Sequence, residues 1–223
     1  MKFLLIAATE AEIAPLIKHI QEANNSVNDR VFNMGGINVK VLITGVGILS
    51  TAYKLSKELN SNKYDLVIQA GIAGSFNKAI NIGDVVFVVS EQYGDLGTED
   101  GELFLDVFDL GLSEPNDNPF INNVLSNNLD RKRYNISLPA VKALTVNKTT
   151  GSKATAELLN KKYNCDLESM EGAALHYVCL SEKVAFAQIR AVSNYIERRN
   201  RESWDIRRAI AALNDWLKAY LIP

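Results

Sequence analysis

Short apolar runs rich in β-branched residues alternate along this chain with longer amphipathic stretches. The apolar runs are typical of buried strands and cover residues 2–8, 39–44, 66–70, 84–90, 141–146 and 185–192. The amphipathic stretches repeat their apolar positions with helical period and cover residues 10–20, 48–59, 152–163, 171–180 and 205–221. This mostly alternating order predicts an α/β fold, a three-layer α/β/α arrangement with a central mixed β-sheet.

The same pattern indicates where function lies, because ligands of such folds bind at the carboxyl ends of the strands. The Met34-Gly35-Gly36-Ile37 turn predicts an early hairpin. Residues 93–133 are the least regular part, with turn-forming residues at 115–119, and we interpret them as an elaborated loop. We therefore predict a single domain over residues 1–223.

The composition narrows the classes of function. With 223 residues, 47% of them hydrophobic, the chain is long enough for one well-buried core. A net charge of -2 leaves no basic surface for a phosphate backbone, so we expect a small-molecule partner and no nucleic acid. The first apolar run is too short for a signal peptide, and no other run approaches a membrane span. We expect a cytoplasmic protein with no membrane partner.

The sequence offers little for a metal ion or a disulfide. Cys165 and Cys179 show no C-x-x-C spacing and are typical of reduced thiols in a cytoplasmic protein. His19 and His176 are far apart and belong to no H-E-x-x-H motif, so we expect no bound metal.

A glycine turn at residues 44–47 (TGVG) closes one strand and opens a helix. It is similar to part of a dinucleotide-binding fingerprint, but Ser50 stands at the third glycine position, so we expect no cofactor. The better interpretation is a tight turn that brings backbone N–H groups close to an anion or a water.

An acidic turn at residues 7–12 (AATEAE) follows the first strand. It reads as a capping box, with Thr9 as the N-cap and Glu12 three residues later, favoured by the helix dipole. It also reads as a carboxylate at the carboxyl end of a strand, where it accepts a proton from water. The residues alone leave both interpretations open.

Three further segments lie at the ends of predicted strands or at the start of a predicted helix. Residues 69–75 (QAGIAGS) predict a second small-residue loop, either a routine glycine turn or a place where a ligand approaches closely. Residues 168–172 (ESMEG) put carboxylates at a helix start, where the dipole alone explains them, although Met170 stands beside Glu171. Residues 190–195 (RAVSNY) end in an amide that either makes a turn or binds, and an arginine-rich loop follows.

The order and spacing of these segments resemble the purine nucleoside phosphorylase/nucleosidase superfamily over most of the chain. AATEAE is similar to the nucleosidase branch, and the phosphorylases' Gly-Asp-Pro turn and phosphate-binding arginine have no counterpart here. ESMEG resembles the ribose-binding motif, and RAVSN resembles the base-binding motif. The strings at 93–101 (YGDLGTEDG), 145–147 (TVN) and 194–204 look like those of futalosine hydrolases in particular.

This resemblance implies a nucleoside phosphorylase-like fold and an N-glycosyl hydrolase. The implied catalytic residues are Glu12, which activates water, Glu171, which holds the ribose hydroxyls, and Asn194, which binds the base. Met170 is expected against the sugar. The remaining expected substrate-binding residues are Gly71, Ile72, Ala73, Gly74, Asn147, Arg199, Arg201 and Trp204.

The residue at position 194 indicates which base is bound. Adenine-specific nucleosidases usually carry aspartate there, whereas an amide donates to N7 and O6 of a 6-oxopurine. The resemblance thus implies hydrolysis of futalosine to hypoxanthine and dehypoxanthine futalosine, in the futalosine route to menaquinone. Arg199 or Arg201 would then pair with the carboxylate on the 5′ side, and Trp204 would pack on its ring.

Other functions remain open at this point. A methylthioadenosine/adenosylhomocysteine-type nucleosidase and a phosphate-dependent phosphorylase would use the same pocket. A non-catalytic nucleoside-binding protein would bind and release no base, and a nicotinamide-dependent oxidoreductase would depend on Gly45 and Gly47 alone. The superfamily usually assembles as homodimers or larger homo-oligomers, so we expect a homo-oligomer.

Overall fold

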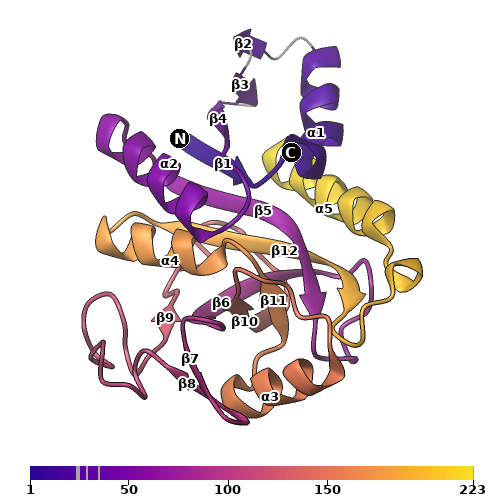
Figure 1. Ribbon diagram of the computed structural model, residues 1–223. Coiled ribbons are helices and arrows are strands. Elements are labelled where there is room, and N and C mark those ends of the chain that lie inside the picture. Colours follow the sequence, from indigo (N-terminus) through magenta and orange to yellow (C-terminus); the bar gives the residue numbers. More distant parts are fainter. Residues whose placement is uncertain (24–25, 29, 35, 223) are drawn as a thin grey trace.

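The computed structural model describes residues 1–23, 26–28, 30–34 and 36–222 (Figure 1). The helices are α1 (Glu10–Glu22), α2 (Ile48–Ser61), α3 (Lys153–Tyr163), α4 (Gly172–Ser181) and α5 (Ile206–Leu221), with a 3-10 turn η1 (Arg201–Ser203). The strands are β1 (Lys2–Ala7), β2 (Ser26–Asn28), β3 (Val31–Met34), β4 (Ile37–Ile43), β5 (Leu66–Ser75), β6 (Val85–Tyr93), β7 (Gly97–Asp100), β8 (Leu103–Asp106), β9 (Leu125–Ser126), β10 (Ala140–Thr145), β11 (Leu167–Ser169) and β12 (Phe186–Tyr195). Every predicted strand and helix is present, and the α/β fold with a central mixed sheet is confirmed.

The main sheet runs in the order β11-β10-β6-β12-β5-β1-β4-β3-β2. β4, β1, β5 and β12 are parallel neighbours, β6 is antiparallel to β12, and β10 and β11 follow parallel to β6. β11 also pairs antiparallel with the end of β5, so this half of the sheet closes on itself. The closure brings the ends of β5, β11 and β12 to one place.

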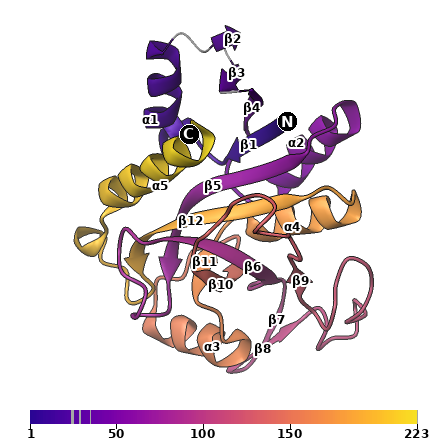
Figure 2. The same cartoon turned by 180° about the vertical axis from the view of Figure 1, so that it is seen from behind.

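Helices cover both faces of the sheet (Figures 1 and 2). α1 packs against α5 on one side and α2 against α4 on the other. The apolar face of α5 repeats at Ala209, Leu213, Leu217 and Leu221, all fully buried against the sheet, as its helical period predicts. Cys165 and Cys179 are free thiols buried in two different hydrophobic clusters.

Of two local predictions, the structure confirms one and contradicts the other. The early hairpin is confirmed, because β3 pairs antiparallel with β4 and Met34 faces Ile37; Gly35 lies outside the described residues. The second small-residue loop is wrong, because Gly71 and Gly74 lie inside β5. The strand continues through the glycines since β11 and β12 supply hydrogen-bonding partners on both sides. The irregular middle holds the β7–β8 hairpin, the short β9 and turns.

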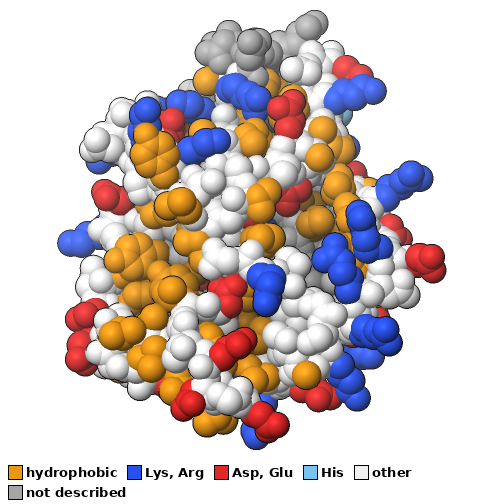
Figure 3. Space-filling model, in the orientation of Figure 1, with side chains coloured by type: hydrophobic (Ala, Val, Ile, Leu, Met, Phe, Trp, Pro, Cys, Tyr) orange, Lys and Arg blue, Asp and Glu red, His pale blue; other side chains and the backbone are white. Residues whose placement is uncertain are grey.

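The surface divides by character on the face shown in Figure 3. Hydrophobic side chains gather on the side where Figure 1 places α2 and α4, and Lys and Arg gather beside α5. The exposed large hydrophobic residues include Leu49 and Tyr53 of α2, Tyr177 of α4, and Leu103 and Leu112 of the irregular middle. Among the helices of the described residues, none has the length and apolar character needed to cross a membrane.

Candidate active site

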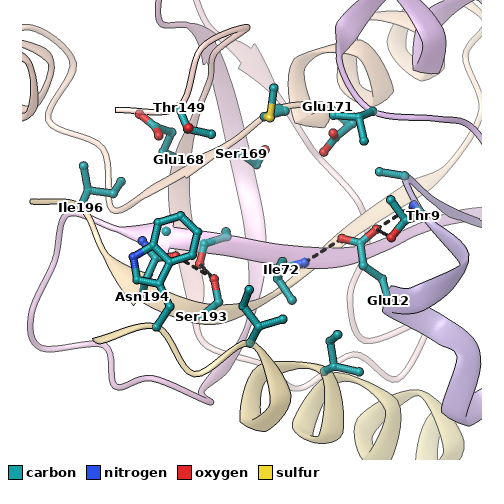
Figure 4. A pocket seen from close by; sticks show the side chains of 18 of the residues that line it. Thr9, Glu12, Ile72, Thr149, Glu168, Ser169, Glu171, Ser193, Asn194 and Ile196 are labelled. Carbon is teal, nitrogen blue, oxygen red and sulfur yellow. Dashed lines mark hydrogen bonds between the residues drawn. The ribbon is translucent and has the colours of Figure 1, made fainter. Parts of the chain in front are cut away.

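A cavity of about 320 Å³ opens at the carboxyl ends of β1, β5, β11 and β12 (Figure 4). The cavity lies at the edge of the sheet where we expect the functional residues. Its lining residues come from the turns after β1 and β4, the ends of the long strands, and the start of α5. They are Ala8, Thr9, Ala11, Glu12, Val46, Ile72, Ala73, Gly74, Thr149, Thr150, Glu168, Ser169, Met170, Glu171, Ser193, Asn194, Ile196, Trp204, Ile206 and Ile210.

The carboxylate of Glu12 serves the helix and the cavity at once. Its Oε2 accepts hydrogen bonds from the backbone N of Thr9 (2.9 Å) and from the Thr9 hydroxyl (3.1 Å), and Thr9 is the N-cap of α1. Its Oε1 accepts from the backbone N of Ile72 (3.2 Å) across the cavity wall. Because the two oxygens have different partners, the capping interpretation and a position in the cavity both hold.

Asn214 of α5 holds the backbone beneath Glu12. In a regular helix the N–H of Leu16 donates to the carbonyl of Glu12, and the amide of Asn214 contacts both of these groups. Its Oδ1 accepts from Leu16 N (3.0 Å), and its Nδ2 donates to the carbonyl oxygens of Glu12 (2.8 Å) and Ile210 (2.7 Å). The side chain is buried, so the first turn of α1 is fixed to α5 at the residue that carries the carboxylate.

Glu171 precedes α4 and is held by two donors. Its Oε1 accepts from the backbone N of Gly47 (3.1 Å), and its Oε2 pairs with Arg190 Nη2 (3.4 Å). Gly47 has φ +93°, a left-handed conformation that favours glycine. The glycine turn thus brings an N–H to an anion, as the sequence indicated, and the anion is the protein's own carboxylate.

Arg190 lies in the sheet below the cavity and is 1% exposed. It also donates to Gln69 Oε1 (3.0 Å) and to the Ile72 carbonyl (3.4 Å). A Cβ on Gly71 would stand 2.3 Å from Arg190 Nη1 and 2.8 Å from Glu12 Oε1. Gly71, predicted to bind substrate, is absent from the described lining residues; it instead leaves room for these two charged groups.

Asn194 lies at the opposite end of the cavity from Glu12 (Figure 4). Its Oδ1 accepts from the Ser193 hydroxyl (2.8 Å), and its Nδ2 donates to the carbonyl of Tyr195 (3.1 Å). Because a carbonyl only accepts, this contact identifies the nitrogen side of the amide. One N–H of the amide is thereby engaged, and the other remains to be donated to a ligand.

Glu168 is a cavity residue that the sequence did not single out. We interpreted it with Glu171 as belonging to a helix start, but it lies in β11 and α4 begins only at Gly172. Its two carboxylate oxygens accept from the backbone N (2.8 Å) and the hydroxyl (2.5 Å) of Thr150. It is 5% exposed, and this burial raises the pKa of its carboxyl, against the lowering effect of the Thr150 bonds.

The other predicted substrate-binding residues divide into two groups. Met170, Ile72, Ala73, Gly74 and Trp204 line the cavity. The lining among the described residues includes neither Asn147 nor the two arginines.

The physical reasons differ for the three residues outside the lining. Asn147 is exposed and bound to Asp95, to which its backbone N (2.6 Å) and side-chain Nδ2 (3.1 Å) donate. Arg199 is exposed and stacks over the Trp204 ring, 5.2 Å from its centroid, which puts it beside the lining. Arg201 begins the exposed turn η1.

Comparison with known proteins gives consistent relatives. The model of the phosphorylase superfamily matches residues 2–221. A futalosine hydrolase from Acidothermus cellulolyticus is 30% identical over 217 residues, covering 96% of this chain and 87% of that protein. A 5′-methylthioadenosine/S-adenosylhomocysteine nucleosidase from Bacillus velezensis is 28% identical over 222 residues, covering 92% and 90%. The solved structure of the nucleosidase of that kind from S. pneumoniae has the same fold, with a TM-score of 0.80 at 20% identity and coverage of 99% and 98%.

Proposed function

This chain belongs to the phosphorylase superfamily and is an N-glycosyl hydrolase, and we propose that its substrate is a 6-oxopurine nucleoside, futalosine, from which it releases hypoxanthine. The observation that carries the proposal is the convergence of two carboxylates, Glu12 and Glu171, and one amide, Asn194, on a single cavity. Relatives named futalosine hydrolase, at 29–34% identity, support the same substrate.

Cleavage of the bond between ribose and base develops positive charge on the sugar ring and negative charge on the departing purine. Glu171 is suited to the sugar, because its carboxylate accepts hydrogen bonds from the ribose hydroxyls more strongly as the ring becomes cationic. Arg190 and the N–H of Gly47 hold that carboxylate in a fixed direction. The substrate therefore meets a preorganised anion.

Glu12 is suited to the water. Its Oε1 faces the cavity beside the N–H of Ile72, while its Oε2 stays bound to Thr9. A water hydrogen-bonded to Oε1 would be oriented toward the sugar and lose a proton to the carboxylate as it attacks. The capping contact and the backbone contact of Asn214 fix the carboxylate from behind, so it keeps this direction without the substrate.

Asn194 is suited to a 6-oxopurine. Its free N–H donates to N7 or O6, where negative charge collects as the base leaves. An amide does not need to be protonated before it can donate, unlike a carboxylate. The Ser193 hydroxyl, held on Oδ1, keeps the nitrogen directed toward the ligand. An adenine-type nucleosidase would need an acceptor for the 6-amino group, which this side of the amide does not offer.

The 5′ side of futalosine carries an aromatic carboxylate, and the mouth of the cavity offers a counterpart. Trp204 lines the cavity, and the guanidinium of Arg199 lies over its indole ring. A small rotation of this exposed side chain would present it to the substrate carboxylate, while Trp204 packs on the ring. Arg201 lies in the next turn and is the alternative partner.

The test is base release from futalosine, inosine and methylthioadenosine, each with and without phosphate, followed by chromatography. We expect hypoxanthine from futalosine at the highest kcat/KM, slower release from inosine, and no dependence on phosphate. Adenine release from methylthioadenosine at the highest rate would replace the proposed substrate, and a requirement for phosphate would make the protein a phosphorylase. Binding of these nucleosides without any release would make it a binding protein.

We further propose a single-domain cytoplasmic protein that acts as a homo-oligomer in menaquinone synthesis. All the strands except the β7–β8 hairpin belong to one 10-stranded sheet, which supports the single domain. The exposed hydrophobic side chains over α2, α4 and the irregular middle support contact with a second copy. Light scattering of the purified protein tests the assembly, and a monomer at working concentration would contradict it.

A further inference from the structure

We propose that Glu168 is a specificity-determining residue that accepts the N1–H of a 6-oxopurine, across the cavity from Asn194. The inference rests on the proposed function, since it concerns how that substrate's base is recognised. It adds a carboxylate to the two that the mechanism uses, and assigns it a different task.

The strand register places the two residues on either side of one glycine. Gly74 of β5 pairs with Glu168 of β11 on one side and with Asn194 of β12 on the other. Directly paired residues of neighbouring strands project from the same face of a sheet, and each step between strands is about 4.8 Å. The two backbones therefore stand about 10 Å apart, which accommodates a planar base with one hydrogen bond on each side.

Gly74 has no side chain, and the side chains of Asn194 and Ile196 occupy the space over it. A Cβ at that position would stand 3.2 Å from Asn194 Nδ2 and 2.9 Å from Ile196 Cγ1. The three residues thus form a row with a polar side chain at each end, and the glycine between them lets Asn194 and Ile196 pack close to the strand. Figure 4 shows Glu168 and Asn194 at the same end of the cavity, away from Glu12 and Glu171.

Thr150 fixes the chemical character of Glu168. Its backbone N–H and its hydroxyl both donate to the carboxylate, one to each oxygen, so both oxygens act as acceptors. Each oxygen keeps a second lone pair, and the burial of the side chain leaves the cavity as the place from which a further donor can come. A donor from the ligand would complete the site.

The two bases differ at the atom that Glu168 would meet. Along one edge, a 6-oxopurine presents the acceptors N7 and O6 and then the donor N1–H, which matches an amide N–H followed by a carboxylate. Adenine presents a lone pair at N1, so a carboxylate there faces acceptor against acceptor. An unmatched buried polar group costs about 1–3 kcal/mol, so Glu168 should favour the 6-oxopurine by about ten- to a hundredfold.

The primary experiment compares kcat/KM for inosine and adenosine in the parent and in Glu168→Gln. The amide keeps the shape but can turn an NH2 toward N1, so we expect the preference for inosine to fall by about ten- to a hundredfold. A second variant, Glu168→Ala, removes both the acceptor and its bulk. It should erase the preference of the parent for inosine over 1-methylinosine, whose N1 carries a methyl group in place of the hydrogen.

Glu157→Gln is the matched control, because Glu157 is an exposed carboxylate of α3 that pairs with Lys153 (3.6 Å) and lies outside the cavity lining. It should keep the base preference of the parent. Unchanged inosine-to-adenosine and inosine-to-1-methylinosine ratios in the folded Glu168 variants would overturn the inference and leave the proposed function standing.

Failure of the proposed function is recognisable separately. If the parent releases no hypoxanthine from any 6-oxopurine nucleoside, calorimetric binding of free hypoxanthine and free adenine replaces turnover. A preference for hypoxanthine that Glu168→Gln abolishes would then support the role of Glu168, and equal loss of affinity for both bases would refute it.

Discussion

Replacing Glu12 by Gln separates the two tasks of one carboxylate. The parent uses Oε2 for the N-cap contacts with Thr9 and Oε1 for the contact with the N–H of Ile72. Glutamine has a single acceptor oxygen. If that oxygen stays with Thr9, the new NH2 group faces the N–H of Ile72, donor against donor, and no group in the cavity can deprotonate water at this point.

The two consequences differ in size. Loss of the general base should reduce kcat by about 10²-fold or more, which corresponds to at least about 3 kcal/mol on the activation barrier. The N–H of Ile72, left without its acceptor, should reduce the free energy of unfolding by about 1–3 kcal/mol. Glutamine also serves at the third position of a capping box, so α1 should keep its first turn.

The assay is single-turnover release of hypoxanthine beside urea denaturation of the same preparations. Glu10→Gln is the matched control, since Glu10 is an exposed carboxylate in the same helical turn that pairs with Arg30 (3.1 Å), outside the cavity lining. It should leave kcat within about twofold of the parent, as expected for a surface substitution. Near-normal kcat in Glu12→Gln with the expected loss of stability would mean that Glu12 only caps the helix, and the mechanism would need another base.

Three other outcomes are expected. Asn194→Asp should shift the ratio of kcat/KM for inosine over adenosine toward adenosine by about ten- to a hundredfold, because the acid must carry a proton to donate to N7; an unchanged ratio would make Asn194 a structural residue. Arg199→Met should raise KM for futalosine and leave the slow cleavage of inosine unaltered, whereas equal losses on both substrates would show a role in the loop. Glu91→Gln should make the free energy of unfolding depend on pH. Burial raises the pKa of Glu91 to about 7, so the contribution of Glu91 to stability falls as pH rises from 4.5 to 7. Burial lowers the pKa of His176 to about 4, so the contribution of His176 to stability grows from pH 4 to 6.5. These opposing effects nearly cancel in the parent, and without Glu91 the unfolding free energy should rise by about 3 kcal/mol between pH 4 and 6.5, which denaturation at several pH values measures.

The parts of the site that the sequence predicted are those with local signals. Glu12 stands in a capping box that begins a helix after a strand, and a capping box specifies its own geometry over four residues. Asn194 stands at the end of β12, whose apolar run is plain in the sequence, so its place at the carboxyl edge could be predicted, and Glu171 stands where the sequence predicts a helix start. The assignment of chemistry to these three came from the resemblance of their motifs.

The parts that were missed depend on contacts between distant segments. The role of Gly74 is set by its pairing with β11 and β12, and no local pattern states which strand closes the sheet. Glu168 looked like a helix-start acid because the short β11 has too few residues to show a strand period. Asn214 reaches across from α5, and a polar residue on the apolar side of an amphipathic helix carries no indication of its partner.

Asn147 is the reverse case. Its motif predicts a substrate contact, and in the structure Asp95 accepts both its backbone and its side-chain donors, so the residue joins two loops. The identity of a polar residue does not indicate whether its hydrogen-bonding partner is a ligand or a protein carboxylate.

The floor of the cavity belongs to β5 and β12, two strands of 10 residues each that run from the hydrophobic core to the cavity, with one shift of register between Val192 and Asn194. Gly74 and Asn194 are therefore paired residues of the same ladder that holds the domain together. Hydrogen exchange at these positions should require the opening of the whole sheet, unlike exchange in a binding loop. New substrate preferences in such a protein should arise by exchange of single side chains on a fixed backbone, and insertions should be tolerated only at the rim, around Arg199 and Trp204.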